Sequence, residues 1–188
     1  MQSFEQEIKT FLRDRNLEYK DNSSSFKRLD FSVVLDEQWT FYFDAKEKRQ
    51  QYNLHNWNLT PEQQEHTFIM DDLAARKILA YAPWSGMVVR DNLRENYYFF
   101  SVLDLFLMPK IRANRPIHKA KKALKGKWVI DLRNGVICAS MTEVLAVIKK
   151  YIAHREELFL HQLDCYGDYT GEDIGLSGEV RKPAYWEI

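Results

Sequence analysis

Between residues 29 and 46, apolar and polar positions alternate in two runs that are separated by a short polar segment. In the first run, every second residue is a large apolar side chain: Leu29, Phe31, Val33 and Leu35. A period of two is typical of a β-strand with two different faces. After the polar residues 36–38, the run from Trp39 to Lys46 is rich in aromatic side chains, which favours a second strand. The pattern therefore predicts a β-hairpin.

The second strand of this hairpin carries its charged residues on one face. Thr40, Tyr42, Asp44 and Lys46 share that face, and Trp39, Phe41, Phe43 and Ala45 share the other. If residues 35 and 38 flank the turn, the antiparallel register pairs Leu29 with Asp44. Asp30 then lies within one position of Asp44. A register slip of one residue would change which face of the hairpin Asp30 shares. Two carboxylates and an amine at one hairpin end are costly to bury without water or a cation. We therefore expect a functional site at this end of the hairpin.

Periodicity elsewhere predicts further helices and strands. Apolar residues at helical spacing predict helices over residues 3–16, 71–81 and 141–163, with a shorter helical segment around 119–124. The run 97–108 is apolar nearly throughout and predicts a central strand, and 127–132 predicts another. Asp104 interrupts the run 97–108, which indicates either a structural partner such as an Arg or a site-lining acid. The sequence thus predicts an α/β domain over residues 1–163, followed by an acidic, Gly-containing tail or irregular wrap over 164–188.

Composition describes an ordinary globular protein. Apolar residues make up 45% of the chain and charged residues 29%, and no apolar run approaches the roughly 20 residues that a membrane span requires. The first residues lack a basic segment followed by an apolar one, and two cysteines are too few for a disulfide framework. We therefore expect a cytoplasmic protein without a membrane partner. Walker and dinucleotide-binding glycine motifs are absent from the sequence, which leaves kinase, NTPase and dehydrogenase functions unsupported.

The net charge of zero conceals two segments of opposite sign. Residues 110–127 contain eight Lys or Arg and no acid, whereas residues 164–179 contain five acids and no Lys or Arg. Such basic runs are usually a solvated face, but phosphate backbones also reward clustered cations through counterion release. The basic run is therefore a candidate nucleic-acid contact.

An Asp entering one strand, a turn, and Asp-x-Lys on the next strand resemble the signature of the PD-(D/E)XK nuclease superfamily. The matching residues are Asp30, Asp44 and Lys46, with Leu29 where the name-giving Pro would stand and Asp44 in place of the commoner Glu. Members of that superfamily also often carry a Glu on the helix before the first strand, and Glu5 occupies a similar place here. The alternative for Glu5 is a solvated acid near a helix start, where the helix dipole favours acids.

The resemblance implies a restriction-endonuclease-like fold with an αβββαβ core, an α/β protein whose mixed central β-sheet is flanked by helices. It implies a metal-dependent nuclease, an endonuclease or nuclease subunit that hydrolyses DNA phosphodiester bonds. Asp30, Asp44, the carbonyl of Ala45 and Glu5 would hold Mg²⁺ or Mn²⁺, since hard oxygen ligands suit these ions. Lys46 would orient the attacking water or neutralise charge in the transition state. Many relatives dimerise, which makes a homodimer or a larger nuclease complex a possible assembly.

Beside this motif, the basic run becomes the expected nucleic-acid surface. In several nuclease families, a Gln or a basic residue shortly after the motif helps to hold the site or the phosphate, and here Arg49 or Gln50 stands at such a place. The expected nucleic-acid contacts are Arg49, Lys110, Arg112, Arg115, Lys119, Lys121, Lys122 and Lys125. The alternative function is a non-catalytic nucleic-acid-binding or protein-interaction module of the same fold, in which Asp44 and Lys46 merely pair across solvent.

Overall fold

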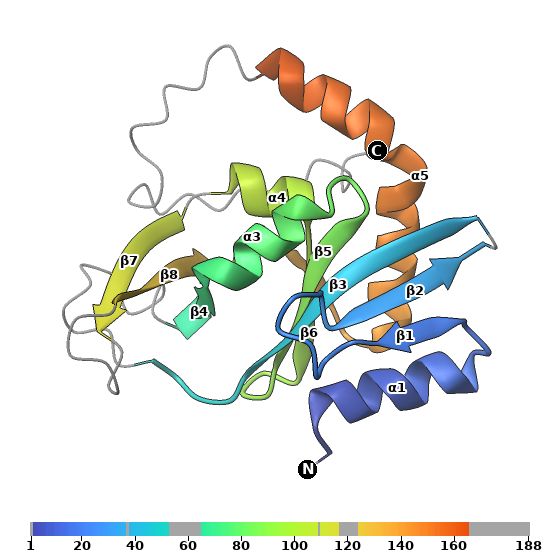
Figure 1. The fold of residues 1–188 in the computed structure, drawn as a ribbon, viewed down its shortest axis with the longest axis horizontal. Helices are drawn as coiled ribbons and strands as arrows, with labels where there is room; N and C mark the ends of the chain where they lie inside the picture. Colours follow the sequence, from blue (N-terminus) through green and yellow to red (C-terminus); the bar gives the residue numbers. More distant parts are fainter. Residues whose placement is uncertain (1, 37, 53–64, 109, 117–123, 166–188) are drawn as a thin grey trace.

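Two β-sheets and the helices packed on them make up the protein (Figure 1). The computed structural model describes residues 2–36, 38–52, 65–108, 110–116 and 124–165. Its helices are α1 (Phe4–Asp14), α3 (Asp72–Ala80), α4 (Val102–Leu107) and α5 (Met141–Cys165), with a short 3₁₀ helix at Leu132–Asn134. Its strands are β1 (Tyr19–Asp21), β2 (Phe31–Leu35), β3 (Trp39–Lys48), β4 (Thr67–Asp71), β5 (Ser85–Asp91), β6 (Asn96–Ser101), β7 (Lys110–Pro116), β8 (Leu124–Asp131) and β9 (Val136–Cys138).

The larger sheet is mixed and has the strand order β1-β2-β3-β5-β6-β9. Strands β3 and β5 run parallel, and the other neighbouring pairs are antiparallel. The chain order of this part is α1, β1, β2, β3, α3, β5, with β4 inserted before α3. This is the αβββαβ order that the resemblance implies. The expected fold class, an α/β protein with a mixed central sheet flanked by helices, is confirmed.

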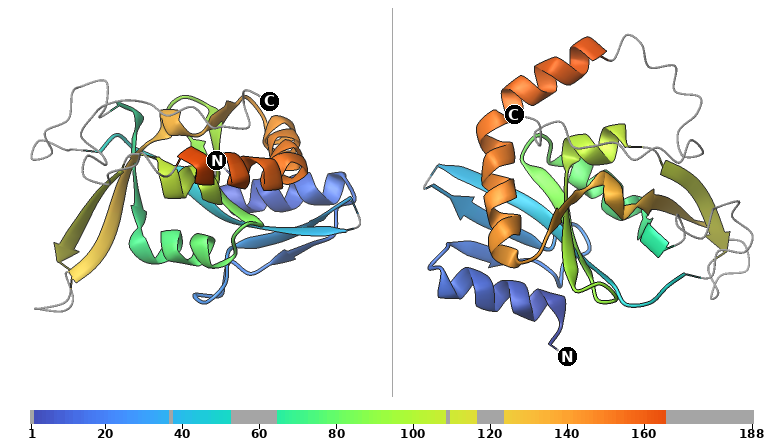
Figure 2. Two further views of the ribbon diagram at one scale, coloured as in Figure 1. Left: turned by 90° about the horizontal axis from the view of Figure 1, so that it is seen from above. Right: turned by 180° about the vertical axis from the view of Figure 1, so that it is seen from behind.

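Helices cover the two faces of this sheet differently (Figure 2). Helices α1 and α5 lie on one face, where Leu12 and Val144 surround a small space together with Val33 and Phe43 of the hairpin. Helix α3 lies on the opposite face, where the ring of Tyr81 contacts that of Tyr42 at 4.6 Å between centroids. Alternation along β3 therefore sends odd-numbered side chains under α1 and α5, and even-numbered ones toward α3.

The hairpin forms as the pattern predicts, but its register differs by one residue. Leu35 pairs with Trp39 and Phe31 pairs with Phe43. Continuing that pairing by one position places Asp30 directly opposite Asp44. The turn therefore holds residues 36–38 between the strands, one residue more than the predicted pairing allows. Asp36 adopts a φ of 51°, a left-handed conformation that Asp tolerates better than most residues.

The prediction of one strand over residues 97–108 is wrong. Strand β6 ends at Ser101, and α4 begins at Val102. The side chain of Ser101 accepts the backbone N–H of Asp104 at 3.2 Å, and the Asp104 carboxylate accepts the N–H of Ser101 at 2.9 Å. This reciprocal capping box starts a helix where apolar content alone favours a strand. Asp104 therefore forms a capping box with Ser101.

Other elements lie close to their predicted places. Helix α1 begins after Ser3, whose hydroxyl accepts the N–H of Gln6, and α3 and α5 fall on the predicted segments. Strand β7 extends through the basic run as far as Pro116, and β8 pairs with β7 and β4 to form the smaller sheet. The helical segment expected around 119–124 lies outside the described residues, except for its last residue. That residue, Leu124, begins β8. The expected tail falls largely outside them too. Among the described helices, none combines the length and apolarity that crossing a bilayer demands.

Candidate functional site

Two acids and a lysine meet where β2 begins beside the middle of β3. Asp30 precedes β2, while Asp44 and Lys46 lie two residues apart on β3. Their even positions place all three on the face toward α3, away from the layer of α1 and α5. On the other side of β3, parallel pairing with β5 sets Asp44 beside Met87 and Lys46 beside Val89. The predicted convergence of Asp30, Asp44 and Lys46 is thus what the structure shows.

Oxygen atoms from three residues surround the ammonium of Lys46. Its Nζ lies 2.6 Å from Asp44 Oδ2, 3.4 Å from Asp30 Oδ2 and 3.3 Å from the carbonyl oxygen of Ala45. The backbone N–H of Ala45 donates to the same Asp30 Oδ2 at 3.0 Å, which fixes that carboxylate against β3. A carboxylate from each strand and a main-chain oxygen therefore converge on one positive charge.

The three side chains differ in their access to solvent. The side chain of Asp44 is 2% exposed, that of Asp30 15% and that of Lys46 30%. Burial raises the pKa of Asp44 to about 6, an effect that Lys46 opposes and Asp30 reinforces. Burial alone would lower the pKa of Lys46, but its attraction to Asp44 and Asp30 holds that pKa above its ordinary value. Lys46 therefore stays charged beside a buried carboxyl group that ionises less readily than an ordinary aspartate.

Asp44 Oδ2 is buried and accepts no hydrogen bond of good geometry within the described residues. Lys46 Nζ is close enough for an ion pair, so the attraction is electrostatic without a well-directed hydrogen bond. Buried carboxylate oxygens rarely lack such a partner. Asp44 Oδ2, Asp30 Oδ2 and the Ala45 carbonyl are hard oxygen donors of the kind that Mg²⁺ and Mn²⁺ prefer. The donor set present here therefore fits a divalent cation.

Glu5 is not brought to this group. It is exposed on α1, and α1 lies on the opposite face of the sheet. The acid of this helix that contacts the sheet is Glu7, which pairs with Arg90 and accepts the hydroxyl of Tyr97. The described residues contain no cluster of three or more His, Cys, Asp or Glu side chains able to hold a metal. A third carboxylate ligand from α1 is therefore not part of the geometry.

Arg49 also lies away from the acids. It directly follows β3, which ends at Lys48, and forms an ion pair with Glu47; its side chain is 71% exposed. Glu47 in turn pairs with Arg90, which joins α1 to β3 and β5. Strand alternation explains the place of Glu47, because an odd separation from Asp44 or Lys46 sends a side chain to the other face.

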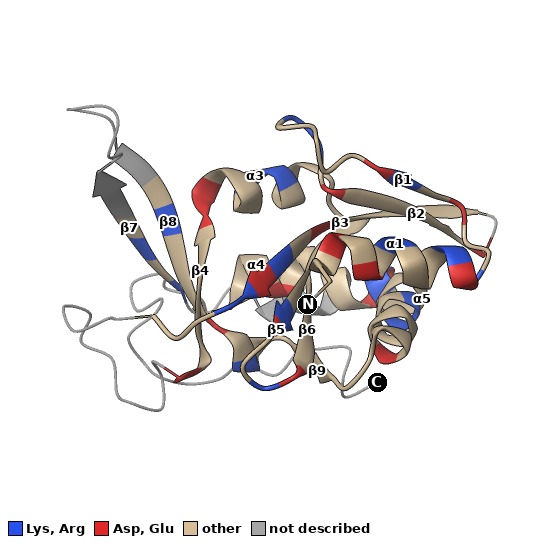
Figure 3. Ribbon diagram, turned by 90° about the horizontal axis from the view of Figure 1, so that it is seen from below, with Lys and Arg blue, Asp and Glu red and all other residues tan. Residues whose placement is uncertain are grey.

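The described cations of the basic run lie on β7 and β8, where Figure 3 marks several of them in blue. Their surroundings differ. Lys110 is buried, and its ammonium donates to the carbonyls of Leu105, Phe106 and Met108 at the end of α4. Burial, with a contribution from Arg112, lowers the pKa of Lys110 to about 8. Lys110 therefore anchors α4 rather than presenting a cation at the surface, which corrects its expected place in the nucleic-acid contact.

The remaining cations of this run lie on the β7–β8 hairpin or outside the described residues. Arg112 is exposed and covers the ring of Trp128 at 5.2 Å from its centroid. The backbone places Arg115 opposite Lys125, so these two positions are neighbours across the hairpin. Lys119, Lys121 and Lys122 lie outside the described residues. Nucleic-acid binding by this hairpin stays a prediction.

A pocket that the sequence did not lead us to expect lies next to the acids. It has a volume of about 360 Å³ and lies on the same face of β2 and β3, between β1, residues 22–29 and the end of α3. Ser32 and Tyr42 contribute to its lining, each two residues from an acid of the site. The signal was present in the alternation that singles out Asp30 and Asp44, since the same period marks Ser32, Val34, Thr40 and Tyr42 as their neighbours on one face.

Comparison with known proteins yields little similarity. No family model matches the chain, and no curated protein matches it in sequence. Among solved structures, one that is similar is a 1.6 Å structure of Archaeoglobus fulgidus Hjc, a Holliday junction resolvase from an archaeal hyperthermophile. The TM-score is 0.41 at 10% sequence identity, and the match covers 70% of this chain and 93% of that one. A likeness this distant carries no weight in the assignment of function, which rests on the site itself.

Proposed function

We propose that this chain is a metal-dependent nuclease of the PD-(D/E)XK type that hydrolyses phosphodiester bonds in DNA. The observation that carries the proposal is the convergence of Asp44 Oδ2, Asp30 Oδ2 and the Ala45 carbonyl within 3.4 Å of one cationic nitrogen. Phosphodiester hydrolysis needs positive charge beside the phosphate and an activated water, and an acidic pair next to a lysine can supply both.

Each residue has a distinct role in this proposal. Asp44 is the anchoring ligand, because its buried oxygen has no other well-directed partner in the described structure. Asp30 is the second ligand, held in place by the N–H of Ala45. Lys46 reaches the solvent edge of the site, where its ammonium can donate to a phosphate oxygen or orient the attacking water. When bound, Mg²⁺ or Mn²⁺ would polarise the phosphate and lower the pKa of a coordinated water.

Titration with Mg²⁺ and Mn²⁺ by calorimetry tests the metal site directly. We expect the unmodified protein to bind one of these ions and the Asp44→Asn variant to lose that binding. Asp36→Asn is a matched control, because it makes the same chemical change at an exposed acid of the hairpin turn. The left-handed φ of residue 36 suits Asn as well as Asp. Equal affinity in Asp44→Asn and Asp36→Asn would exclude Asp44 as a ligand.

Cleavage of end-labelled single-stranded, duplex and branched DNA then tests the reaction. We expect Mg²⁺-dependent products with the unmodified protein and with Asp36→Asn. Asp30→Asn and Asp44→Asn should lose at least about 100-fold in rate, the scale of removing one charge-stabilising group from an active site. Normal cleavage by either of these two variants would contradict the assignment.

A second candidate is favoured by the ion pair itself. Lys46 already lies 2.6 Å from Asp44, so the three residues can also form a permanent structural pair in a non-catalytic nucleic-acid-binding or protein-interaction module. In that module the ammonium keeps its position and divalent ions do not bind. The calorimetric titration separates the two functions, because a permanent pair predicts no heat of metal binding, even with nucleic acid present.

A further inference from the structure

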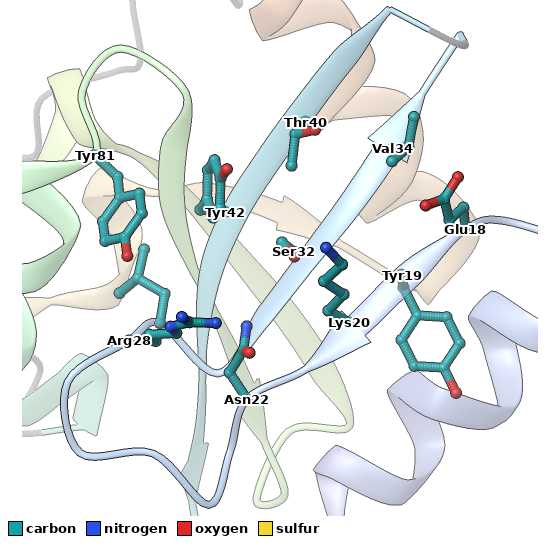
Figure 4. A pocket seen from close by; sticks show the side chains of 11 residues that line it. Glu18, Tyr19, Lys20, Asn22, Arg28, Ser32, Val34, Thr40, Tyr42 and Tyr81 are labelled. Atoms are coloured by element: carbon teal, nitrogen blue, oxygen red, sulfur yellow. The ribbon is translucent and has the colours of Figure 1, made fainter.

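The pocket beside the acidic site has polar, aromatic and cationic walls (Figure 4). Its floor is the face of β2 and β3 that also carries Asp30, Asp44 and Lys46, and its volume is about 360 Å³. That volume lies in the lower part of the range of small-molecule sites, about 300–1,000 Å³. The pocket is therefore large enough for one small organic group and too small for a folded partner.

One wall of the pocket is aromatic. Tyr42 of β3 and Tyr81, which follows α3, have ring centroids 4.6 Å apart with planes inclined by 38°. Both rings are only half-buried, so each keeps an edge or a face toward the pocket. Nucleobases stack on aromatic side chains of this kind whatever their sequence. An aromatic wall above a polar floor suits a planar heterocycle.

The other walls carry positive charge. Lys20 approaches from β1 and lies beside Ser32, and Arg28 approaches from the loop before β2 and lies near Asn22 (Figure 4). Both side chains are exposed. Within the described residues, neither cation has a carboxylate partner. Glu18 also lines the pocket, but it lies at the far end, beside Val34. The middle of the pocket therefore presents two cations to an incoming anion.

The pocket lies next to the acidic site along β2 and β3, although Asp30, Asp44 and Lys46 do not line it. Ser32 is two residues from Asp30 along β2, and Tyr42 is two residues from Asp44 along β3, a separation of about 7 Å on a strand. The main-chain oxygen of Arg28, two residues before Asp30, accepts a hydrogen bond from Lys77, which holds this part of the loop against α3. A chain of alternating phosphates and bases that occupies the pocket thus reaches the acids within about one step.

We propose that this pocket binds one unpaired nucleotide of the strand that is cut, next to the scissile phosphate. The base stacks against Tyr42 and Tyr81, and its phosphate lies between Lys20 and Arg28. A base within a duplex is stacked and paired on all sides, so it cannot enter the pocket. The chain therefore selects nucleic acid that is single-stranded beside the cut, an inference that rests on the proposed function for the place of the scissile bond.

Binding without divalent ions tests this assignment apart from cleavage. Fluorescence anisotropy of a labelled 12-nucleotide single strand and of the matching duplex, both in EDTA, gives the two affinities (a length of about one site of a single-strand binding fold). We expect the single strand to bind more tightly than the duplex. Tyr81→Leu, which keeps apolar volume but removes the ring, should weaken single-strand binding about 5- to 100-fold.

A paired substitution tests the cations. Lys20→Gln with Arg28→Gln should lower the slope of log affinity against log salt by about 0.7, the value for one phosphate contact on a single strand, because the two cations flank one phosphate. Arg13→Gln with Lys149→Gln is the matched control, since it also removes two positive charges but from α1 and α5 on the opposite face. The control should leave that slope unchanged. Thermal unfolding of every variant shows that the fold is retained.

Each of four outcomes would overturn the proposal. Two concern affinity: the duplex binds as tightly as the single strand, or Tyr81→Leu binds the single strand as tightly as the unmodified protein. The third is the same salt slope in Lys20→Gln/Arg28→Gln as in the control pair, and the fourth is complete displacement of the bound single strand by a free nucleoside monophosphate. The last outcome would assign the pocket to a free nucleotide instead of a strand. Failure of the proposed function is a different result, namely no cleavage and no metal binding while selective single-strand binding persists. Retained binding in Asp44→Asn together with lost cleavage supports both proposals.

Discussion

Asp44 and Glu47 lie three residues apart on β3, on opposite faces of the same sheet, and their pKa values shift in opposite directions. Burial raises the pKa of Asp44 to about 6. Burial acts the same way on Glu47, but hydrogen bonds from Arg49 and Arg90 outweigh it and leave the pKa of Glu47 below its ordinary value. The two acids therefore differ in both depth and partners: the Asp44 side chain is 2% exposed and that of Glu47 is 11% exposed, and only Glu47 accepts hydrogen bonds from arginines.

The partners also differ in kind. Arg90 pairs with Glu47 and Glu7 and donates to the main-chain oxygen of Gln2, so a planar fork ties α1 to the sheet. On the other face, the single ammonium of Lys46 is shared by two acids and a carbonyl. A carboxylate satisfied by arginines is part of the scaffold. A carboxylate such as that of Asp44, with an oxygen that accepts no well-directed hydrogen bond from the described residues, remains available to a metal ion.

The largest expected effect comes from removing Arg90, the shared partner of Glu7 and Glu47. Arg90→Met leaves Glu7 and Glu47 without their shared partner in a largely buried place. We expect the free energy of unfolding in urea to fall by about 3–5 kcal/mol, the usual cost of removing one partner of a buried ion pair. Magnesium affinity of the remaining folded protein should be unchanged. A variant with native stability, or one with lost magnesium binding, would contradict the division between the two faces.

Lys46→Met tests the opposite face. We expect DNA cleavage to fall about 100- to 1,000-fold, because the group that neutralises charge at the phosphate is gone. Magnesium should bind at least as tightly as before, since the ammonium no longer competes for Asp30 and Asp44. Arg49→Gln serves as the control on the other face of β3, and its cleavage rate should equal that of the unmodified protein. Weaker magnesium binding in Lys46→Met would mean that the lysine supports the site instead of competing for it.

The pH dependence of stability should have opposite signs on the two faces. Because the pKa of Asp44 rises from 3.8 to about 6 on folding, its contribution is fully present below pH 4 and is lost as pH rises through 6. In EDTA, the stability of Asp44→Asn relative to the unmodified protein should therefore grow by about 2 kcal/mol between pH 4 and pH 7.

Glu47 provides the comparison for this measurement. Its pKa is lowered on folding, so its contribution is present above its ordinary pKa of 4.5 and is lost as pH falls. The destabilisation caused by Glu47→Gln should accordingly shrink toward low pH. Urea unfolding of both variants across the same pH range measures the two trends, and parallel trends would refute the contrast.

The sequence predicts the fold class and the convergence of Asp30, Asp44 and Lys46, but it does not predict where the other expected site residues lie. Alternation along two short strands is enough to bring Asp30, Asp44 and Lys46 together, because even a one-residue error in the turn leaves Asp30 within one position of Asp44. The same alternation could have shown that Glu47, the partner of Arg49, lies on the other face. Position on helix α1 could not decide between Glu5 and Glu7, because that choice depends on where Arg90 of the distant β5 reaches the helix.

Elements without a regular period were harder to predict. The run 97–108 is apolar in both its strand and its helix, and the boundary depends on one capping interaction between Ser101 and Asp104. The basic run contains Lys110, whose burial follows from the three carbonyls at the end of α4 and has no mark in the sequence. Charge content identifies a basic segment, but it does not say which of its side chains reach solvent.

The smallest expected effect concerns two exposed arginines, one on β7 without a carboxylate partner among the described residues and one on α3 with such a partner. Arg112 is exposed over Trp128 and has no carboxylate partner within the described residues, whereas Arg76 of α3 is as exposed but pairs with Asp72 at 2.6 Å. If β7 contacts DNA, Arg112→Gln should reduce the salt slope of duplex binding by about one. Arg76→Gln should leave it unchanged, because its charge is already neutralised. Anisotropy titrations at several salt concentrations measure both slopes. An equal loss in the two variants would show that exposure alone, rather than the absence of a partner, determines which cations bind phosphate.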